Sequence, residues 1–148
     1  MTTSTRHDRL GWIASRDPLN VVALTDQVID QLGHDSRSSY VETYWLPILG
    51  PSAILAARRL GEWLESSPDG IEISLEQFGR SLGLGGVGRN SPTVRTLTRL
   101  VDFNMATIGG EVYQVRRVFP PLAARHLDRL PGYLAAQHNT LNGLAVAS

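Results

Sequence analysis

The apolar positions along the chain recur mainly at helical spacing. Residues 52–66 are the most apolar stretch, and their pattern predicts a central core helix whose main face is Ala53, Ala56, Ala57, Leu60, Trp63 and Leu64. Asp17 and Pro18 are a suitable N-cap and first-turn residue, so residues 17–33 predict a second helix. The pattern therefore indicates a mainly helical protein.

Shorter signals surround these two helices. Ser39 and Glu42 have the spacing of a capping box and predict a short helix that Pro47 limits. Residues 1–16 are mostly polar and predict a flexible N-terminal arm.

The C-terminal part begins after Phe119-Pro120-Pro121, which stops any preceding strand. Short helices are predicted over Leu122–Leu130 and about Leu134–Leu141, and the small residues at 144–148 predict a frayed end.

The middle of the chain mixes strand and helix signals. Ile71–Ile73 alternates as a short strand does, and Ser74 with Gln77 forms a second capping box at the start of a small helix. Ser91 and Pro92 then open a helix that extends to Asn104. Its predicted inward positions are Val94, Leu97, Leu100 and Val101, and its predicted outward positions are Thr93, Arg95, Thr96 and Arg99. Gly109-Gly110 between β-prone runs predicts a hairpin over residues 106–118.

The composition narrows the function classes. The chain has 148 residues, no cysteine and a formal net charge of zero, and all 14 basic residues are arginine. Thiolate nucleophiles, Cys-ligated metals and Schiff-base lysines are thereby excluded. The start has no apolar leader and no run is long enough for a membrane helix, so we expect a cytoplasmic protein without a membrane partner.

The zero net charge hides an uneven distribution. Residues 1–79 hold six arginines and eleven acidic residues, a net charge of −5, whereas residues 80–148 hold eight arginines and three acidic residues, a net charge of +5. Such asymmetry is typical of a protein with one polyanion-binding face.

The order helix, short strand, helix, helix, hairpin resembles that of winged helix-turn-helix domains. The segment Ser74–Leu84 resembles their supporting helix, Ser91–Leu100 their recognition helix, and Glu111–Val118 their second wing strand. The resemblance covers roughly residues 51–118, although the connection Gly83–Asn90 is longer than the usual turn. Residues 40–52 also resemble a block in small proteins of high-GC bacteria, which indicates no function.

The predicted fold class is therefore mainly α (α+β). It comprises a flexible arm (1–16), an N-terminal helical extension (17–50), a winged-helix core with a short β-hairpin wing (51–118) and a C-terminal helical extension (119–148).

The resemblance implies double-stranded DNA as the partner and transcription regulation as the role. Arginine binds guanine edges and phosphates, and threonine reaches phosphate or a thymine methyl group. The candidate DNA-binding residues are Arg80, Arg89, Asn90, Thr93, Arg95, Thr96, Arg99, Arg116 and Arg117. Arg116 and Arg117 point to opposite faces of an extended strand, so only one of them can easily join the recognition surface. The alternative for Arg95 and Arg99 is a solvated arginine face paired with Asp102 or Glu111.

A homodimer would double the DNA contacts, with the apolar N-terminal helix or the C-terminal helices as its interface. The alternative function is a winged-helix protein–protein interaction module that recruits a replication, segregation or transcription component through the acidic N-terminal half.

The sequence predicts no enzyme, cofactor or metal. Gly83–Gly88 matches G-x-G-x-x-G, but a dinucleotide site needs a preceding strand, and here a helix is predicted. The four histidines are too scattered for a metal cluster and are interpreted as structural.

Overall fold

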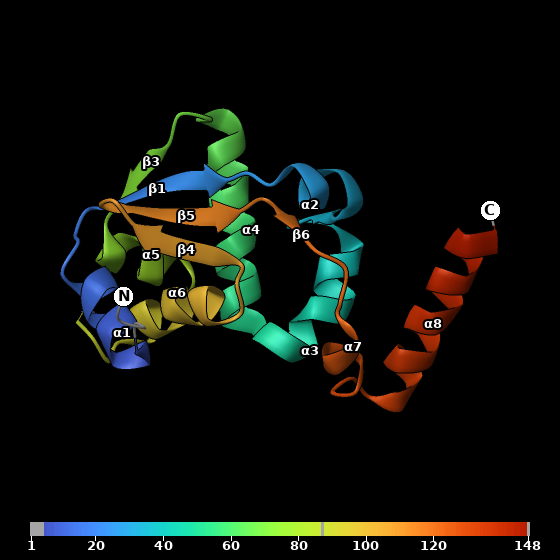
Figure 1. Cartoon of the computed structure of the whole chain (residues 1–148). Coiled ribbons are helices and arrows are strands. Elements are labelled where there is room, and N and C mark those ends of the chain that lie inside the picture. Colours follow the sequence, from blue (N-terminus) through green and yellow to red (C-terminus); the bar gives the residue numbers. More distant parts are fainter. Residues whose placement is uncertain (1–4, 87, 148) are drawn as a thin grey trace.

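The structure, a computed structural model, describes residues 5–86 and 88–147, with residues 142–147 described by their backbone alone. The elements in chain order are α1 (Arg6–Ala14), β1 (Leu19–Leu24), α2 (Gln27–Leu32), β2 (His34–Asp35), the π-helical turn η1 (Val41–Trp45), α3 (Leu46–Leu49), α4 (Pro51–Ser66), β3 (Ile71–Ile73), α5 (Leu75–Ser81), α6 (Pro92–Asp102), β4 (Ala106–Gly109), β5 (Val112–Arg116), β6 (Val118–Phe119), α7 (Ala124–Leu127) and α8 (Gly132–Ala147). The fold is α+β, as predicted, with a four-stranded mixed sheet above α5 and α6 and with α4 passing behind (Figure 1).

The core helix α4 lies where the apolar pattern predicts it. Its alanines and Leu60 and Leu64 are buried, whereas Trp63 lies at the surface and contacts the Phe78 ring edge-on at 5.8 Å. The predicted inward position of Trp63 is wrong. Ile54, which belongs to a second apolar face, is buried, so the buried face of α4 is turned towards Ile54 and away from Trp63.

The middle segment has the predicted order of elements. The Ser74 hydroxyl accepts from Gln77 N–H at 3.2 Å at the start of α5, and the Ser91 hydroxyl accepts from Val94 N–H at 3.2 Å at the start of α6. β4 and β5 pair as the predicted antiparallel hairpin, with Ile108 opposite Tyr113. The serine caps therefore located α5 and α6 correctly, whereas the hairpin turn lies at Gly110 and Glu111, one residue after the predicted glycine pair, because Gly109 pairs with Val112 in the ladder.

The prediction of a helix over residues 17–33 is wrong in its first part. Residues 19–24 form β1, which lies between β3 and β5, antiparallel to the first and parallel to the second (Figure 1). Leu19 and Val21 are buried and Asn20 is exposed, so the strand alternation coincides with a helical-looking apolar spacing. The pairing partners at 71–73 and 112–116 decide the outcome, because tertiary pairing overrides local propensity.

Asp17 is also a cap, but of a distant helix. Its Oδ1 accepts from Leu75 N–H at 3.1 Å, beside the Ser74 cap of α5. The capping chemistry was therefore predicted correctly and assigned to the wrong helix.

Residues 6–14 form helix α1 where a flexible arm is predicted; residues 1–4 lie outside the described part. Thr5 and Asp8 form a capping box, and Leu10 and Ile13 are buried against the core. α1 packs on α6 and is fixed to it by ion pairs from Arg6 and Arg9 to Asp102. The arm prediction fails because nine residues with two buried apolar side chains need a packing partner that local sequence does not reveal.

The segment before α4 is helical but has no capping box. The hydroxyl of Ser38, not that of Ser39, accepts from Val41 N–H at 3.3 Å. The wider π turn η1 then leads directly into α3, where Pro47 lies in the first turn. The helical segment ends at Leu49, before Gly50, so the prediction that Pro47 limits it is wrong.

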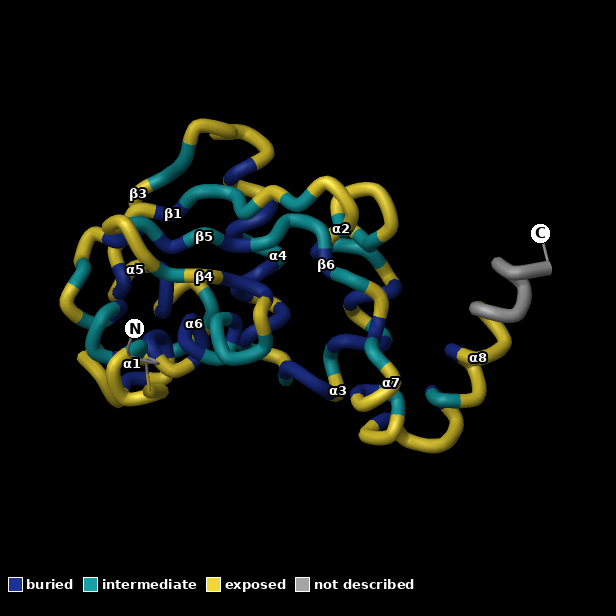
Figure 2. The backbone as a smooth tube through the Cα atoms, viewed as in Figure 1, coloured by how far each residue is buried: buried dark blue, intermediate teal, exposed yellow. Residues whose placement is uncertain are grey.

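A second group of elements packs beside the sheet. β2 pairs with β6, and Trp45 Nε1–H donates to Pro120 O at 2.9 Å. Within the predicted helix 122–130 only α7 is helical. α8 begins at Gly132 and contacts the segment around η1 through His138, whose Nε2 lies 2.7 Å from the Tyr40 hydroxyl, while most of its other described residues are exposed (Figure 2). No described helix is long and apolar enough to span a bilayer.

Candidate functional site

Helix α6 exposes a narrower face than the sequence predicts. Val94, Leu97 and Leu100 are buried as predicted, but Thr93 and Thr96 are buried too, with exposed fractions of 1% and 7%. The predicted outward positions of Thr93 and Thr96 are therefore wrong. The open side of α6 is limited to a stripe that includes Pro92, Arg95 and Arg99.

The close approach of α5 explains the burial of Thr93. A Cβ placed on Gly79 would lie 2.0 Å from Thr93 Oγ1, so the two helices touch at this glycine. The small threonine side chain fills such a contact as well as an apolar residue does. A sequence pattern that counts threonine as polar therefore places it on the outside.

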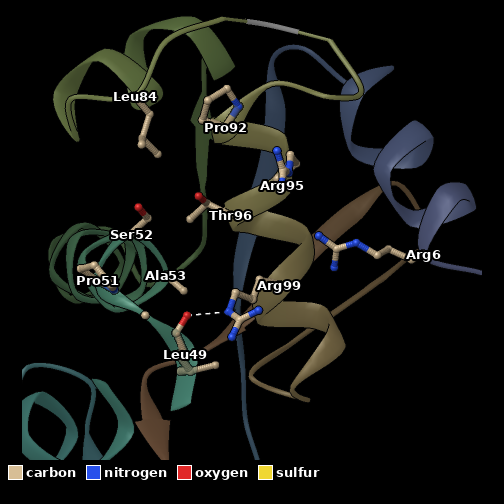
Figure 3. A pocket seen from close by; sticks show the side chains of 11 residues that line it. Arg6, Leu49, Pro51, Ser52, Ala53, Leu84, Pro92, Arg95, Thr96 and Arg99 are labelled. Carbon is tan, nitrogen blue, oxygen red and sulfur yellow. Dashed lines mark hydrogen bonds between the residues drawn. The ribbon is translucent and has the colours of Figure 1, made fainter. Parts of the chain in front are cut away.

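The open stripe of α6 forms the floor of a groove. α1 lies on one side and the junction of α3 and α4 on the other (Figure 3). The groove has a volume of about 300 Å³ and is lined by Arg6, Leu49, Gly50, Pro51, Ser52, Ala53, Leu84, Pro92, Arg95, Thr96 and Arg99. Three of these residues are arginine and none is acidic, although Arg6 is paired with Asp102, so the uncompensated positive charge of the lining comes from Arg95 and Arg99.

Arg99 serves the structure of the groove. Its Nε–H donates to Leu49 O at 2.6 Å and its Nη2–H to Ile48 O at 2.9 Å, so the guanidinium caps the C-terminal end of α3. Its Cζ also lies 4.8 Å from the centroid of the Phe103 ring. Arg99 therefore adds charge to the groove and fixes the backbone just before α4.

Arg95 and Arg6 differ in how far they are engaged. Arg6 pairs with Asp102, which also accepts from Arg9 Nη2–H at 2.6 Å. Arg95 is exposed and has no hydrogen bond or ion pair with any residue in 5–86 or 88–147. Arg95 is thus the lining cation best placed to meet a ligand.

The remaining candidate residues lie outside this groove. Arg80 is exposed on α5, and Arg89 and Asn90 are exposed in the connection to α6, where Arg89 Nη1 lies 2.8 Å from His7 Nε2. The structure brings Arg89 to α1 and not to the open stripe of α6.

The two wing arginines contact different partners, in keeping with their predicted opposite directions. Arg116 Nε–H donates to Asn104 O at 2.8 Å, and its Nη1 lies 3.9 Å from Asp26 Oδ2. Arg117 Nη2 lies 4.0 Å from Glu65 Oε2. Neither side chain lines the groove.

A second positive hollow continues from the C-terminal end of α6. It is lined by Asp102, Phe103, Asn104, Arg125, His126 and Arg129, and it adjoins the groove because Asp102 pairs with Arg6 and Phe103 contacts Arg99. Burial, together with Arg125 and Arg129, lowers the pKa of His126, which favours the neutral ring at neutral pH.

Sequence reasoning missed Arg6, Ser52, Arg125 and Arg129 as members of this surface. The excess of arginine after residue 80 was a signal for the last two, but nothing in the local sequence places α7 or α1 beside α6.

The other chemical candidates do not form sites. The glycine-rich loop follows helix α5 and not a strand, although Val87 within it lies outside the described residues. His126 and His138 are buried, and within the described ranges no group of three or more His, Asp or Glu side chains is arranged to hold a metal ion.

Comparison of the chain with family models, with characterised proteins and with solved structures finds no significant match.

Proposed function

We propose that this chain is a DNA-binding protein of the winged-helix type that acts in transcription regulation. The observation that supports it most is the groove along α6, where Arg6, Arg95 and Arg99 meet without any acidic side chain in the lining. The order β3, α5, α6, β4 and β5 adds to this support, since it is the order of elements in winged-helix domains.

The proposed contact is mainly to phosphates. α6 lies between α1 and α4, and the side chains of Thr93 and Thr96 are buried. In this proposal Arg95 is therefore the described α6 residue that contacts base edges. Arg6 and the hollow with Arg125 and Arg129 extend the positive surface along the same helix. Contacts of this kind position a protein on the duplex and depend strongly on salt.

The expected salt dependence follows from the number of contacts. Three phosphate contacts predict a slope of about −2.7 in log affinity against log salt, or about 40-fold weaker binding between about 50 and 200 mM salt. Fluorescence anisotropy with a labelled duplex measures this slope directly. A failure to bind any duplex at the lower salt concentration would overturn the proposal.

A matched pair of variants tests the place of binding. Arg95→Gln should lower the magnitude of the slope by about 1. Arg58→Gln removes the same charge from α4, where Arg58 Nη1 lies 3.7 Å from Glu42 Oε2 outside the groove, and should leave the slope unchanged. Equal effects of the two variants would show that binding does not depend on the groove.

A further inference from the structure

We propose that the groove contains a discrete oxyanion site, at the N-terminus of α4, that holds one phosphoryl group. The inference rests on the proposed function insofar as a DNA phosphate is one source of that group, and a free phosphate monoester is the other. The experiment below separates the site from the DNA-binding function.

The first turn of α4 offers unpaired donors. Gly50 precedes the helix without a side-chain cap, and the first bond of the turn runs from Ile54 N–H to Gly50 O at 3.2 Å. Pro51 has no N–H, and the N–H groups of Ser52 and Ala53 make no hydrogen bond within the described ranges. These donors stand at the positive end of a 16-residue helix, which attracts an anion.

Thr96 provides an independent sign of a ligand. Its side chain is more than nine-tenths buried, lines the groove, and is directed towards Ser52 and Ala53 (Figure 3). Its hydroxyl has no hydrogen bond to any described residue. Thr98, two positions further and also buried, donates to Val94 O at 2.8 Å. The Thr96 oxygen is not among the fully buried unpaired atoms of the described residues, so it opens onto the groove, where a ligand oxygen would be its partner.

The charges favour an anion over any other ligand. The two N–H groups can only donate, and Arg95 and Arg6 add positive charge to the same groove. The hydroxyls of Ser52 and Thr96 complete a set of donors that matches the several oxygens of a phosphate. A cation finds no carboxylate in the lining.

The size of the groove indicates that the phosphoryl group belongs to a larger molecule. A volume of about 300 Å³ open to solvent exceeds the needs of one tetrahedral anion. The remainder extends along α6 past Arg99, which is where a nucleotide or the next residue of a DNA strand would lie.

Inorganic phosphate is the probe for the first experiment, titrated into the full chain at ionic strength held constant with chloride. In ¹H–¹⁵N spectra we expect saturable shifts of the Ser52 and Ala53 amides. Thr96→Val, which keeps the shape and removes the hydroxyl, should weaken phosphate binding about tenfold. Unchanged Ser52 and Ala53 amides, or equal binding by Thr96→Val, would overturn the site.

Ser52→Asp provides a variant that should not fail to fold. A carboxylate in the first turn should raise the melting temperature without phosphate, since it interacts favourably with the helix end, and should abolish the stabilisation by phosphate. Ser66→Asp, with the same charge at the other end of α4, should retain phosphate binding. Loss of binding in both variants would show a non-specific charge effect and overturn the site.

The two proposals fail separately. If duplex DNA binds but inorganic phosphate shifts neither amide, the oxyanion site is wrong and the DNA-binding function stands. If phosphate binds but no duplex does, the DNA-binding function is wrong and the site stands. Comparison of a nucleoside monophosphate with duplexes that carry or lack a 5′-phosphate identifies the source of the group.

Discussion

Gly79→Ala tests the close contact between α5 and α6, the helix that forms the floor of the groove. The new Cβ would lie 2.0 Å from Thr93 Oγ1 and 3.2 Å from Leu84 O, whereas ordinary contacts begin at 3.4 Å. Thr93 is 1% exposed in a close-packed contact, so Thr93 must shift or the two helices must separate.

The magnitude follows from two opposed effects. Overpacking of a close-packed contact costs up to about 3 kcal/mol, and alanine in place of glycine within a helix regains about 1 kcal/mol. We therefore expect Gly79→Ala to lower the free energy of unfolding by about 2 kcal/mol. Urea denaturation followed by circular dichroism measures this loss.

Thr93 variants show whether the clash is the cause. Thr93→Ala removes the atom that the new Cβ meets, together with a buried hydroxyl that has no described partner. The double variant Gly79→Ala/Thr93→Ala should lose about 1.5 kcal/mol less unfolding free energy than the sum of the losses in the two single variants, as expected for side chains in contact. Thr93→Val keeps the bulk and should not rescue. If Thr93→Ala and Thr93→Val rescued Gly79→Ala equally, or if Gly79→Ala were as stable as the wild type, the clash with Thr93 would not be the cause.

Three further predictions concern the surroundings of the groove. Arg99→Ala leaves two carbonyl groups of α3 without their donors and should cost about 2 kcal/mol of stability in urea denaturation, with Arg99→Lys intermediate. Asp102→Asn removes the negative charge and one of the two acceptor oxygens that Arg6 and Arg9 share, and we expect faster hydrogen exchange over residues 6–14 than over α5. Burial lowers the pKa of His138 below 6.5, so the neutral ring is favoured in the folded state. The contribution of the neutral His138 ring to the free energy of unfolding is fully present above pH 6.5 and is lost as the pH falls through the lower folded-state pKa. His138→Gln should make stability less dependent on pH across that range; an unchanged dependence would contradict this assignment.

Elements fixed by local chemistry could be predicted from the sequence. α4, α5, α6 and the β4–β5 hairpin were located by apolar periodicity, by the serine caps at 74 and 91, and by the glycine pair at 109 and 110. Each of these signals acts within a few residues, so one sequence contains all the information needed.

Elements fixed by distant partners could not be predicted. β1 depends on strands about 50 and 90 positions further along the chain, and α1 depends on the surface of α6. The same limit applies to the site. Arg95 and Arg99 were predicted from the helix alone, whereas Arg6 and Ser52 join them only through tertiary packing, and the buried state of Thr96 depends on neighbours that periodicity does not describe.

The central position of β1 has a consequence for synthesis of the chain. Val21 pairs with Tyr113, 92 positions later, so on the ribosome β1 emerges long before the parallel neighbour that completes its ladder. Until residues 112–116 emerge, the edge of β1 that β5 will cover is available to other chains, which is a risk for aggregation. A fragment of residues 51–118 lacks β1 and leaves β3 and β5 without their shared neighbour. The predicted boundary at residue 51 therefore cuts through the sheet, because β1 pairs with strands on the other side of it.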